Sequence, residues 1–156
     1  MRIRALTPED YAPLISAVDA WWGGRPVAAM LPRLFFVHFR DTGFVAEADG
    51  HRVGFVSGFL SPALPDEAYI HFLGVHPDHR KRGVARALYE RFFRTAVEAG
   101  RCRVKCVTSP ANALSVAFHR AMGFRPEGPA RTAEGLPFHP DYDGPVEDRV
   151  LLVKEL

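Results

Sequence analysis

The sequence predicts an α/β protein built on a mixed sheet with helical crossovers, and two observations support this. First, β-rich runs alternate with segments that have helical spacing of apolar residues along most of the chain. Second, the β-rich runs 43–49 and 51–60 are separated only by Asp49-Gly50, which is typical of the tight turn between antiparallel strands. The 156 residues are 47% hydrophobic and 24% charged, as in an average soluble domain, so we expect one domain over residues 1–156.

The N-terminal part predicts a strand followed by helices. Residues 2–6 alternate as in a short strand. Thr7-Pro8-Glu9-Asp10 then supplies an N-cap, a proline for the first helical position and an acidic first turn, which predicts a helix over about residues 8–20. Residues 27–40 predict a second helix, which Pro32 must either kink or begin.

The remaining elements alternate between strand and helix. We expect strands over 68–75, 103–108 and 148–155, a long helix over about 82–99 and a helix from Ser109-Pro110 to about Met122. The long helix should bury Ala85, Leu88, Phe92 and Ala96 and expose Glu90 and Arg94, and the shorter helix should bury Leu114, Ala117, Phe118 and Ala121. Residues 127–146 are expected to form a long loop, and such loops are usually functional or disordered.

Charge and cysteine content exclude several functional classes. Lys and Arg number 20 against 18 Asp and Glu, and a net charge of +2 does not indicate a nucleic-acid partner. No window approaches the roughly 20 apolar residues of a membrane span, and no signal sequence is evident, so we expect a cytoplasmic protein without a membrane partner. Cys102 and Cys106 would lie about 13 Å apart on one side of a strand, which predicts two reduced packing residues; a metal pair is the alternative.

The most informative stretch runs from Val75 to Ala85 and joins a strand to the start of the long helix. A helix start offers free amides and the positive end of the helix dipole, and Gly83 with Ala85 lets the backbone approach an anion closely. The surrounding cations are Arg80, Lys81, Arg82 and Arg86. The turn therefore suits a phosphate or pyrophosphate, although it is neither a P-loop nor a GxGxxG motif. The alternative is a glycine that only shapes the helix start, beside a solvated basic face.

The wider pattern resembles a known family. V-x-P-x-x-R-x-x-G-x-A on this turn, followed by Asn112 and an alanine-rich helix that ends in Gly-Phe, resembles the GNAT superfamily of acyl-CoA-dependent N-acetyltransferases, most sharply over Ala68–Phe124. The resemblance implies a mostly antiparallel sheet of six to seven strands flanked by about four helices. It also implies acetyl-CoA as cosubstrate without a metal, a primary amine on a small molecule or a peptide as acceptor, and a possible homodimer.

The resemblance further implies where the cofactor is held. Amides of the turn would bind the CoA pyrophosphate, and two backbone positions of the preceding strand would hold the pantetheine arm where that strand bulges and splays from its neighbour. Asn112 corresponds to the asparagine that faces the cofactor in the family. The implied cofactor-binding residues are Leu73, Val75, Arg80, Lys81, Arg82, Gly83, Val84, Ala85 and Asn112.

Acetyl transfer requires a neutral amine, a polarised thioester carbonyl and a proton for the departing thiolate. The family often supplies that proton from a tyrosine seven residues after the asparagine, and this chain has His119 there. Helical spacing predicts that His119 shares a face with Asn112 and Ser115 and looks toward the cofactor. His119 is therefore a candidate proton donor or water-holding group; the alternative is a partly exposed histidine without a catalytic role.

The candidate base lies on the strand 68–75, where alternation predicts that Tyr69, His71 and Leu73 share one face. A glutamate of some family members falls at Tyr69, so the nearest carboxylate here is that of Glu67. Because a histidine titrates near neutral pH, His71 is a candidate base; the alternative is an ordinary strand histidine. We therefore take His119, His71 and Tyr69 as the candidate catalytic residues.

Other side chains leave alternatives open. A metal held by His71, His76 and His79 is disfavoured because two of them lie in the phosphate turn. Aromatic side chains could line an acceptor pocket or belong to a core or dimer contact: Trp21, Trp22, Phe35, Phe36 and Phe39. Acidic and tyrosine residues near the C-terminus could attract a cationic amine or form a solvated loop: Asp141, Tyr142, Asp143, Glu147 and Asp148. A non-catalytic acyl-CoA-binding module is the rival to an enzyme.

Overall fold

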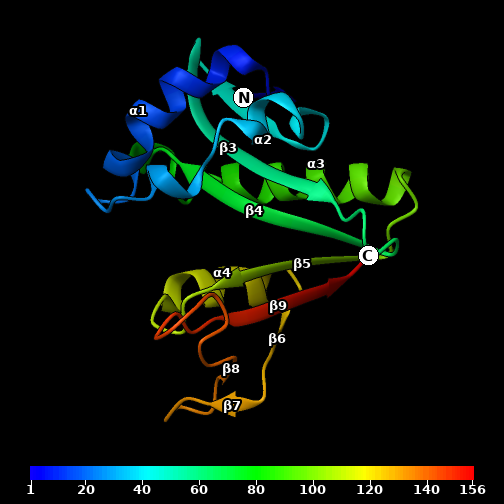
Figure 1. The fold of residues 1–156 in the computed structure, drawn as a ribbon. Helices are drawn as coiled ribbons and strands as arrows, with labels where there is room; N and C mark the ends of the chain where they lie inside the picture. The colour runs from blue at the N-terminus through cyan, green and yellow to red at the C-terminus, as the bar shows by residue number, and fades with distance from the viewer.

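The computed structural model describes all 156 residues, and its centre is a seven-stranded sheet in the order β1-β2-β3-β4-β5-β9-β6 (Figure 1). Its strands are β1 (Arg2–Ala5), β2 (Phe44–Ala48), β3 (His51–Leu60), β4 (Glu67–Val75), β5 (Arg103–Thr108), β6 (Arg125–Glu127) and β9 (Val150–Glu155). Every neighbouring pair is antiparallel except β4 and β5, which run parallel. The predicted mixed, mostly antiparallel sheet is confirmed.

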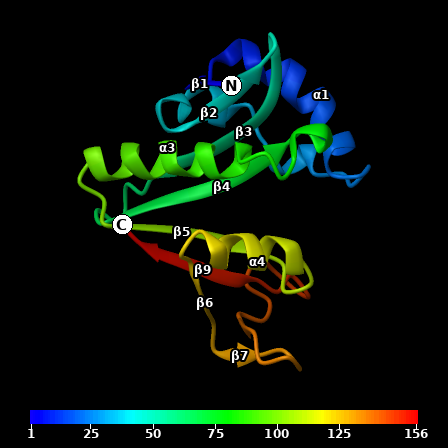
Figure 2. The same cartoon turned by 180° about the vertical axis from the view of Figure 1, so that it is seen from behind.

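Helices cover both faces of the sheet, as Figures 1 and 2 show from opposite sides. On one face lie α1 (Tyr11–Trp21) and α2 (Leu34–Val37), and on the other lie α3 (Val84–Glu98) and α4 (Ala113–Ala121). Each face has its own buried apolar cluster: one beneath α3 includes Leu88 and Phe92, and one beneath α1 and α2 includes Phe55 and Phe72. The sheet thus separates an α1 side from an α3 side.

The predicted hairpin is confirmed at its turn, whereas two other expectations are wrong. Asp49 and Gly50 have φ angles of 51° and 77°, the left-handed pair that a two-residue hairpin loop requires. Residues 27–40 are not one helix: they form a short 3-10 turn at Ala28–Met30 and the single turn α2, because a proline at position 32 prevents a helix from continuing through it. The expected loop 127–146 contains a small hairpin, β7 (Ala130–Arg131) and β8 (Pro137–Phe138).

Details of the other elements also differ from expectation. A short 3-10 turn, Pro8–Asp10, precedes α1. Helix α3 buries Leu88, Phe92 and Ala96 as predicted, but Val84 and Tyr89 complete its buried face and Ala85 is only half-buried. Both cysteines are free, and only Cys106 is buried, so the expectation that both pack is wrong for exposed Cys102.

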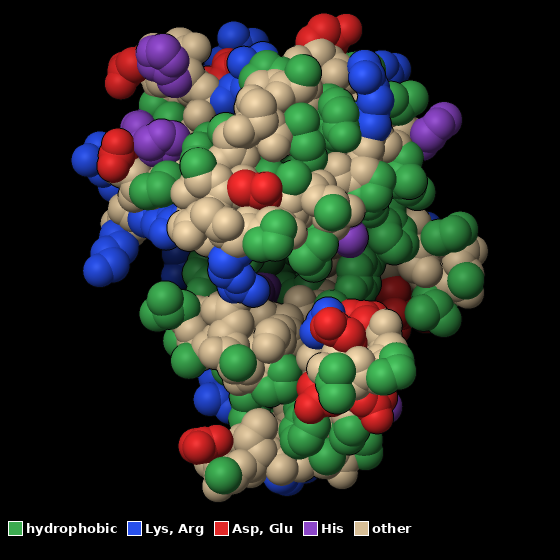
Figure 3. Space-filling model, turned by 60° about the vertical axis from the view of Figure 1, so that its left-hand side comes forward, with side chains coloured by type: hydrophobic (Ala, Val, Ile, Leu, Met, Phe, Trp, Pro, Cys, Tyr) green, Lys and Arg blue, Asp and Glu red, His purple; other side chains and the backbone are tan.

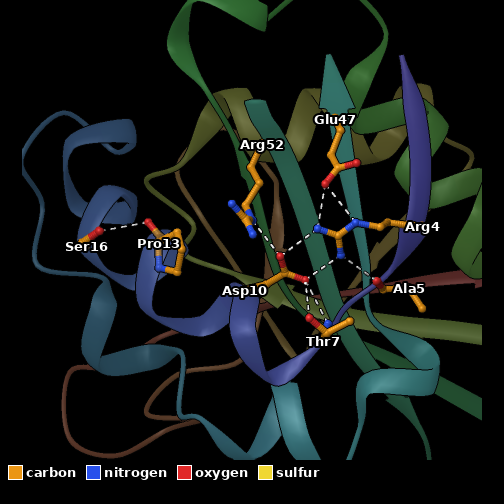
Figure 4. A network of polar contacts seen from close by, with 8 residues as sticks. All are labelled: Arg4, Ala5, Thr7, Asp10, Pro13, Ser16, Glu47 and Arg52. Atoms are coloured by element: carbon orange, nitrogen blue, oxygen red, sulfur yellow. Dashed lines mark hydrogen bonds and ion pairs between the residues drawn. The ribbon is translucent and has the colours of Figure 1, made fainter. Parts of the chain in front are cut away.

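Asp10, at the start of α1, is fully buried and organises a network of charges that Figure 4 shows. Its carboxylate accepts hydrogen bonds from Arg4 at 2.7 and 2.9 Å, from Arg52 at 2.7 Å and from the amide of Thr7 at 2.9 Å. Glu47 accepts from the same Arg4 guanidinium at 2.7 Å. Although burial opposes ionisation, these donors hold the pKa of the Asp10 carboxyl well below its usual range. The network therefore ties α1 to strands β1, β2 and β3.

Replacing Asp10 with asparagine should lower the free energy of unfolding by about 3 kcal/mol, because Arg52 loses its carboxylate partner and Arg4 keeps only that of Glu47. The pKa of Asp10 is depressed in the folded state, so its contribution should be complete above about pH 4 and decrease as the pH falls further. Denaturant unfolding between acid and neutral pH measures this, with Glu9→Gln at the adjacent exposed position as control. Equal stabilities of Asp10→Asn and Glu9→Gln at neutral pH would contradict it.

Candidate active site

Strands β4 and β5 separate after only three paired residues. Glu67, Ala68 and Tyr69 pair with residues 103–105, and beyond Lys105 no pairing continues. Both strands then diverge toward their C-terminal ends, which leaves an opening in the sheet (Figure 1). Figure 3 shows a hollow between the upper and lower parts of the molecule, with Asp and Glu side chains gathered beside it on the lower part. The opening is this unpaired region between β4 and β5, beyond Tyr69 and Lys105.

A β-bulge in β4 lies at this opening. Ser57 of β3 pairs with Phe72 and Gly58 pairs with Ile70, so His71 has no partner across the β3–β4 ladder. An extra residue of this kind bends its strand and re-aims the side chains beyond it. The bulge is the local feature that accompanies the divergence of β4 from β5.

Because of the bulge, the side chains that share a face of β4 differ from those predicted from the sequence. Tyr69 stacks on Phe59 and His71 stacks on Phe35, both on the α1 side. Leu73 instead packs against the cluster beneath α3. The expectation that Tyr69, His71 and Leu73 share a face is therefore wrong for Leu73, because the inserted residue reverses the alternation of side chains along the strand.

The turn after β4 has the geometry of an anion-binding site. Lys81 and Gly83 have φ angles of 60° and 80°, and α3 begins directly after Gly83. The amides of residues 81–86 donate no hydrogen bond within the chain, and the first helical bond runs from the Ala87 amide to the Gly83 carbonyl at 3.0 Å. Left-handed residues in such a turn direct successive amides into one concavity. The Arg80 amide differs from the predicted set, because it donates to the Pro77 carbonyl.

The backbone before the turn also faces the opening. The His76 amide donates to the Val53 carbonyl of β3 at 2.9 Å. Because hydrogen-bonding direction alternates along a strand, Leu73 and Val75 direct their amides and carbonyls away from β3, toward the opening. Free amides, left-handed residues and an unpaired strand edge together fit the pyrophosphate and the amide-bearing arm of CoA. The backbone of Leu73 and Val75 and the free amides of residues 81–85 thus follow one another along the chain at the end of β4.

Helix α4 departs from expectation in its start and in its buried face. It begins at Ala113, and Asn112 is its N-cap, with the side-chain oxygen accepting from the Ser115 amide at 3.1 Å. Leu114 is 87% exposed, and the exposed side also carries Ala117 and Ala121. The buried residues are Val116 and His119. Apolar spacing misidentified this face because the buried histidine has polar partners that a sequence pattern does not show.

The partners of His119 are the Ser115 carbonyl and the Tyr89 hydroxyl. Nδ1–H donates to the carbonyl at 2.7 Å, so Nε2 is the unprotonated nitrogen and accepts from Tyr89 at 3.0 Å. Burial lowers the pKa of His119 and raises that of Tyr89 well above its ordinary value. His119 is therefore held neutral between α3 and α4, and neither ring nitrogen is free to give a proton to a thiolate. Sequence reasoning missed Tyr89, since only folding brings it beside a residue 30 positions away.

His71 has a different environment on the α1 side. Its Nε2–H donates to the Met30 carbonyl at 2.5 Å, and its ring lies parallel to that of Phe35 with 4.2 Å between centroids. Nδ1 is therefore the unprotonated nitrogen; it has no partner in the chain and is not buried. Burial of the ring lowers the pKa of His71, which favours the neutral form. An oriented, neutral imidazole with one open basic nitrogen has the properties of a general base.

Nearby carboxylates are mostly engaged. Glu67, at the closed end of the opening, accepts from Lys105 at 2.7 Å and lies 3.5 Å from Arg103. In the segment before β9, Arg149 pairs with Asp143 at 2.7 Å and Glu147 at 2.9 Å. The carboxylates of residues 141 and 148 accept backbone amides of the same segment. Residues 139–149 still carry more acidic than basic side chains, so this segment remains a negative border near Tyr69.

The aromatic side chains considered for an acceptor pocket belong to the apolar core on the α1 side. Trp21, Phe35 and Phe36 are buried in the cluster beneath α1 and α2, and Trp22 and Phe39 pack against it. No group of three or more His, Cys, Asp or Glu side chains could hold a metal ion. None of the helices is long and apolar enough to cross a membrane.

Comparison with known proteins identifies the family. The sequence model of the acetyltransferase (GNAT) family matches residues 7–124, more than half of the chain. The chain belongs to the GNAT family. The L-2,4-diaminobutyric acid acetyltransferase of Nocardia farcinica is 36% identical over 87 residues, which cover 56% of this chain and 45% of that protein. The chain spans about half the length of the curated relatives it matches.

Solved structures agree with the GNAT fold over the whole chain. An aminoglycoside 6'-acetyltransferase type Ii has a TM-score of 0.75 at 14% identity, covering 99% of this chain and 97% of that one. The yncA protein of Salmonella typhimurium, solved with its cofactor acetyl-CoA, has a TM-score of 0.71 at 21% identity, covering 100% and 94%. At these identities the likeness concerns the fold.

The Tyr89–His119 hydrogen bond should be measurable as a coupling energy. Tyr89→Phe and His119→Phe should each lower the free energy of unfolding by about 1–3 kcal/mol, because each leaves a buried polar atom unpaired, and the double variant should lose less than their sum. Since the folded-state pKa of His119 is lowered, its contribution should be complete above about pH 6.5 and decrease below it.

Denaturant unfolding of the four proteins across this pH range gives the coupling energy and its pH dependence. His51→Gln, at an exposed histidine, is the control for a general effect of removing a titrating group. Strictly additive single and double variants would show that the two side chains do not interact.

Proposed function

We propose that this GNAT chain transfers the acetyl group of acetyl-CoA to a primary amine by direct attack in a ternary complex. The observation that carries the proposal is the run of free amides 81–86, which directly follows the edge of β4 that is unpaired on its β5 side. When bound there, acetyl-CoA supplies an activated acyl thioester. The named activity of the curated relatives supports this assignment.

Backbone amides and carbonyls, more than side chains, would bind acetyl-CoA. The amides of Lys81, Arg82, Gly83, Val84 and Ala85 would hold the pyrophosphate, with the start of α3 adding its positive dipole end. The edge of β4 beyond the bulge would pair with the pantetheine arm through the amides and carbonyls of residues 73 and 75. Asn112, which caps α4, would border the cofactor from the other side of the opening.

Acetyl transfer to an ammonium group requires that two protons leave the nitrogen, one before it attacks and one afterwards to water, and that one proton reach the thiolate. The amine nitrogen forms a bond to the carbonyl carbon, the carbon–sulfur bond breaks, and CoA departs with the electron pair. His71 would take the ammonium proton at Nδ1, because Met30 and Phe35 hold the ring with this nitrogen open. Tyr69, on the same face, would border the amine. With His119 fully engaged, the thiolate would take its proton from water.

The acceptor we propose is a small molecule with a primary amine and a positive charge. The negative border formed by residues 139–149 lies near Tyr69 and would attract a cation. The segment that holds His71, residues 28–39, covers the α1 side of β4 with aromatic rings. The diaminobutyric acid acetyltransferases among the relatives act, by name, on an acceptor of this chemistry.

Acetyl-CoA should raise the thermal midpoint of the wild type and not that of Gly83→Glu. A ligand at 100 times its dissociation constant adds about 2.7 kcal/mol of stability, and a carboxylate at this turn would repel the pyrophosphate. Gly83→Ala is the matched control, since both variants bear the strain of a side chain at φ 80° and only one adds a charge. It should retain most of the shift. No shift in the wild type at saturating acetyl-CoA would refute the cofactor assignment.

The catalytic role of His71 should appear in a panel of amines assayed for CoA release. The wild type should acetylate small diamines and diamino acids faster than peptides with a free N-terminus, and His71→Gln should reduce kcat by roughly 10²–10⁴-fold. Because burial lowers the pKa of His71, the acidic limb of its pH profile should lie below pH 6.5 and vanish in His71→Gln. Tyr69→Phe is the control on the same face and should keep this limb.

Two outcomes of the panel would overturn parts of the proposal. Binding of acetyl-CoA without CoA release for any amine would indicate a binding module in place of an enzyme. Faster transfer to peptides than to every small amine would overturn the proposed acceptor class.

A further inference from the structure

Arg80 is the basic side chain of the turn that reaches back into the fold. Its Nε donates to the Val75 carbonyl at 3.3 Å, and its Nη2 donates to the Trp21 carbonyl. The neighbouring cations do not do this: Arg86 lies 3.9 Å from Glu90 on its own helix, and Lys81 and Arg82 are exposed without partners. One guanidinium thus bridges the end of β4 and the end of α1.

One carbonyl that accepts from Arg80 lies at the end of a helix, and the other lies at the opening between β4 and β5. Trp21 is the last residue of α1, where carbonyls lack helical partners and a cation is favoured by the helix dipole, so Arg80 supplies both the missing donor and the charge. Val75 is one of the two residues whose backbone borders the opening between β4 and β5. The same side chain therefore touches the cofactor path and stabilises the end of a helix on the α1 side.

The end of α1 lies between the turn and the proposed base. The Trp21 ring meets the edge of the His76 ring, in the turn, with 5.5 Å between centroids. Trp22 packs on Phe72 at 5.5 Å, and Phe72 directly follows His71 in β4. A displacement of the end of α1 would therefore change the packing around His76 in the turn and around Phe72 next to His71.

We propose that Arg80 is a positioning residue that couples occupancy of the turn to the end of α1. The inference rests on the proposed function, because it takes CoA as the ligand of the turn. A phosphate on the amides 81–86 would compete for the guanidinium, since it carries the opposite charge and can accept two parallel hydrogen bonds from it, whereas each carbonyl is neutral and accepts one. Arg80 then leaves Val75 to the ligand and withdraws from Trp21. Cofactor binding thereby changes the packing at the end of α1, on the acceptor side of β4.

Intrinsic fluorescence tests this directly, because the only two tryptophans of the chain are Trp21 and Trp22. Wild-type protein is titrated with CoA, and binding is followed independently by calorimetry. The emission should change with the same dissociation constant that calorimetry gives. Trp22→Phe leaves Trp21 as the single reporter and should retain a response.

Arg80→Ala should still bind CoA, because the amides remain, but its emission should not respond. Its emission without CoA should already match that of CoA-saturated wild type. Arg80→Lys keeps the charge with one donor group in place of a fork and should give a partial response. Arg82→Ala is the matched control: it removes the same charge from the same turn and leaves the bridge, so it should bind CoA more weakly with a full emission change.

Each failure has a separate meaning. CoA binding to the wild type without an emission change, or the same change in Arg80→Ala, would overturn the coupling and leave the proposed function intact. Absence of CoA binding by calorimetry would overturn both. If Arg80→Ala does not fold by circular dichroism, the comparison of Arg80→Lys with Arg82→Ala decides, and equal responses of these two would refute the role of Arg80.

Discussion

The divergence of β4 from β5 is the constraint on which the rest of the site depends. A continuous sheet would separate an α3-side ligand from an α1-side ligand by a layer of backbone. Here the two strands pair over three residues and then diverge, so the edge of β4 beyond Tyr69 has no strand paired on its β5 side. In the proposed reaction, the thioester would lie along this edge of β4 and the amine would approach from the α1 side. The free amides, His71 and the negative border would serve one reaction only because the two strands diverge here.

The opening persists because each strand is secured on its other side. β5 pairs with β9 over all six of its residues, and β4 pairs with β3 on both sides of the bulge. Close packing around the bulge requires glycine: a Cβ at Gly58 would lie 2.4 Å from the Tyr69 carbonyl oxygen, and one at Gly74 would lie 2.6 Å from the Phe55 ring. Glycine at these two positions thus lets β3 and β4 bend at the bulge while the two strands stay paired.

Sequence predicted the features that have local causes. The Asp49-Gly50 hairpin, strand 103–108 and the anion-binding turn follow from residues that are adjacent in the chain. The family resemblance implied a bulge in β4, but its position at His71 depends on the register against β3, and it placed Leu73 on the face opposite to the expected one. The buried face of α4 was likewise unpredictable, since burial of His119 depends on a hydroxyl from α3. Local signals predicted a turn with free amides, while long-range contacts determine which imidazole has an open nitrogen.

Buried His119 and half-buried His71 show how main-chain partners assign different capacities to the same side chain. In both, a carbonyl fixes the protonated nitrogen: Met30 holds Nε2–H of His71, and Ser115 holds Nδ1–H of His119. A neutral carbonyl orients an imidazole without the charge by which a carboxylate would raise its pKa, so burial prevails and both rings favour the neutral form. Whether each imidazole can accept a proton then depends on its other, unprotonated ring nitrogen. That of His119 is occupied by Tyr89, whereas that of His71 is open, and only an open nitrogen can accept a proton from an approaching amine.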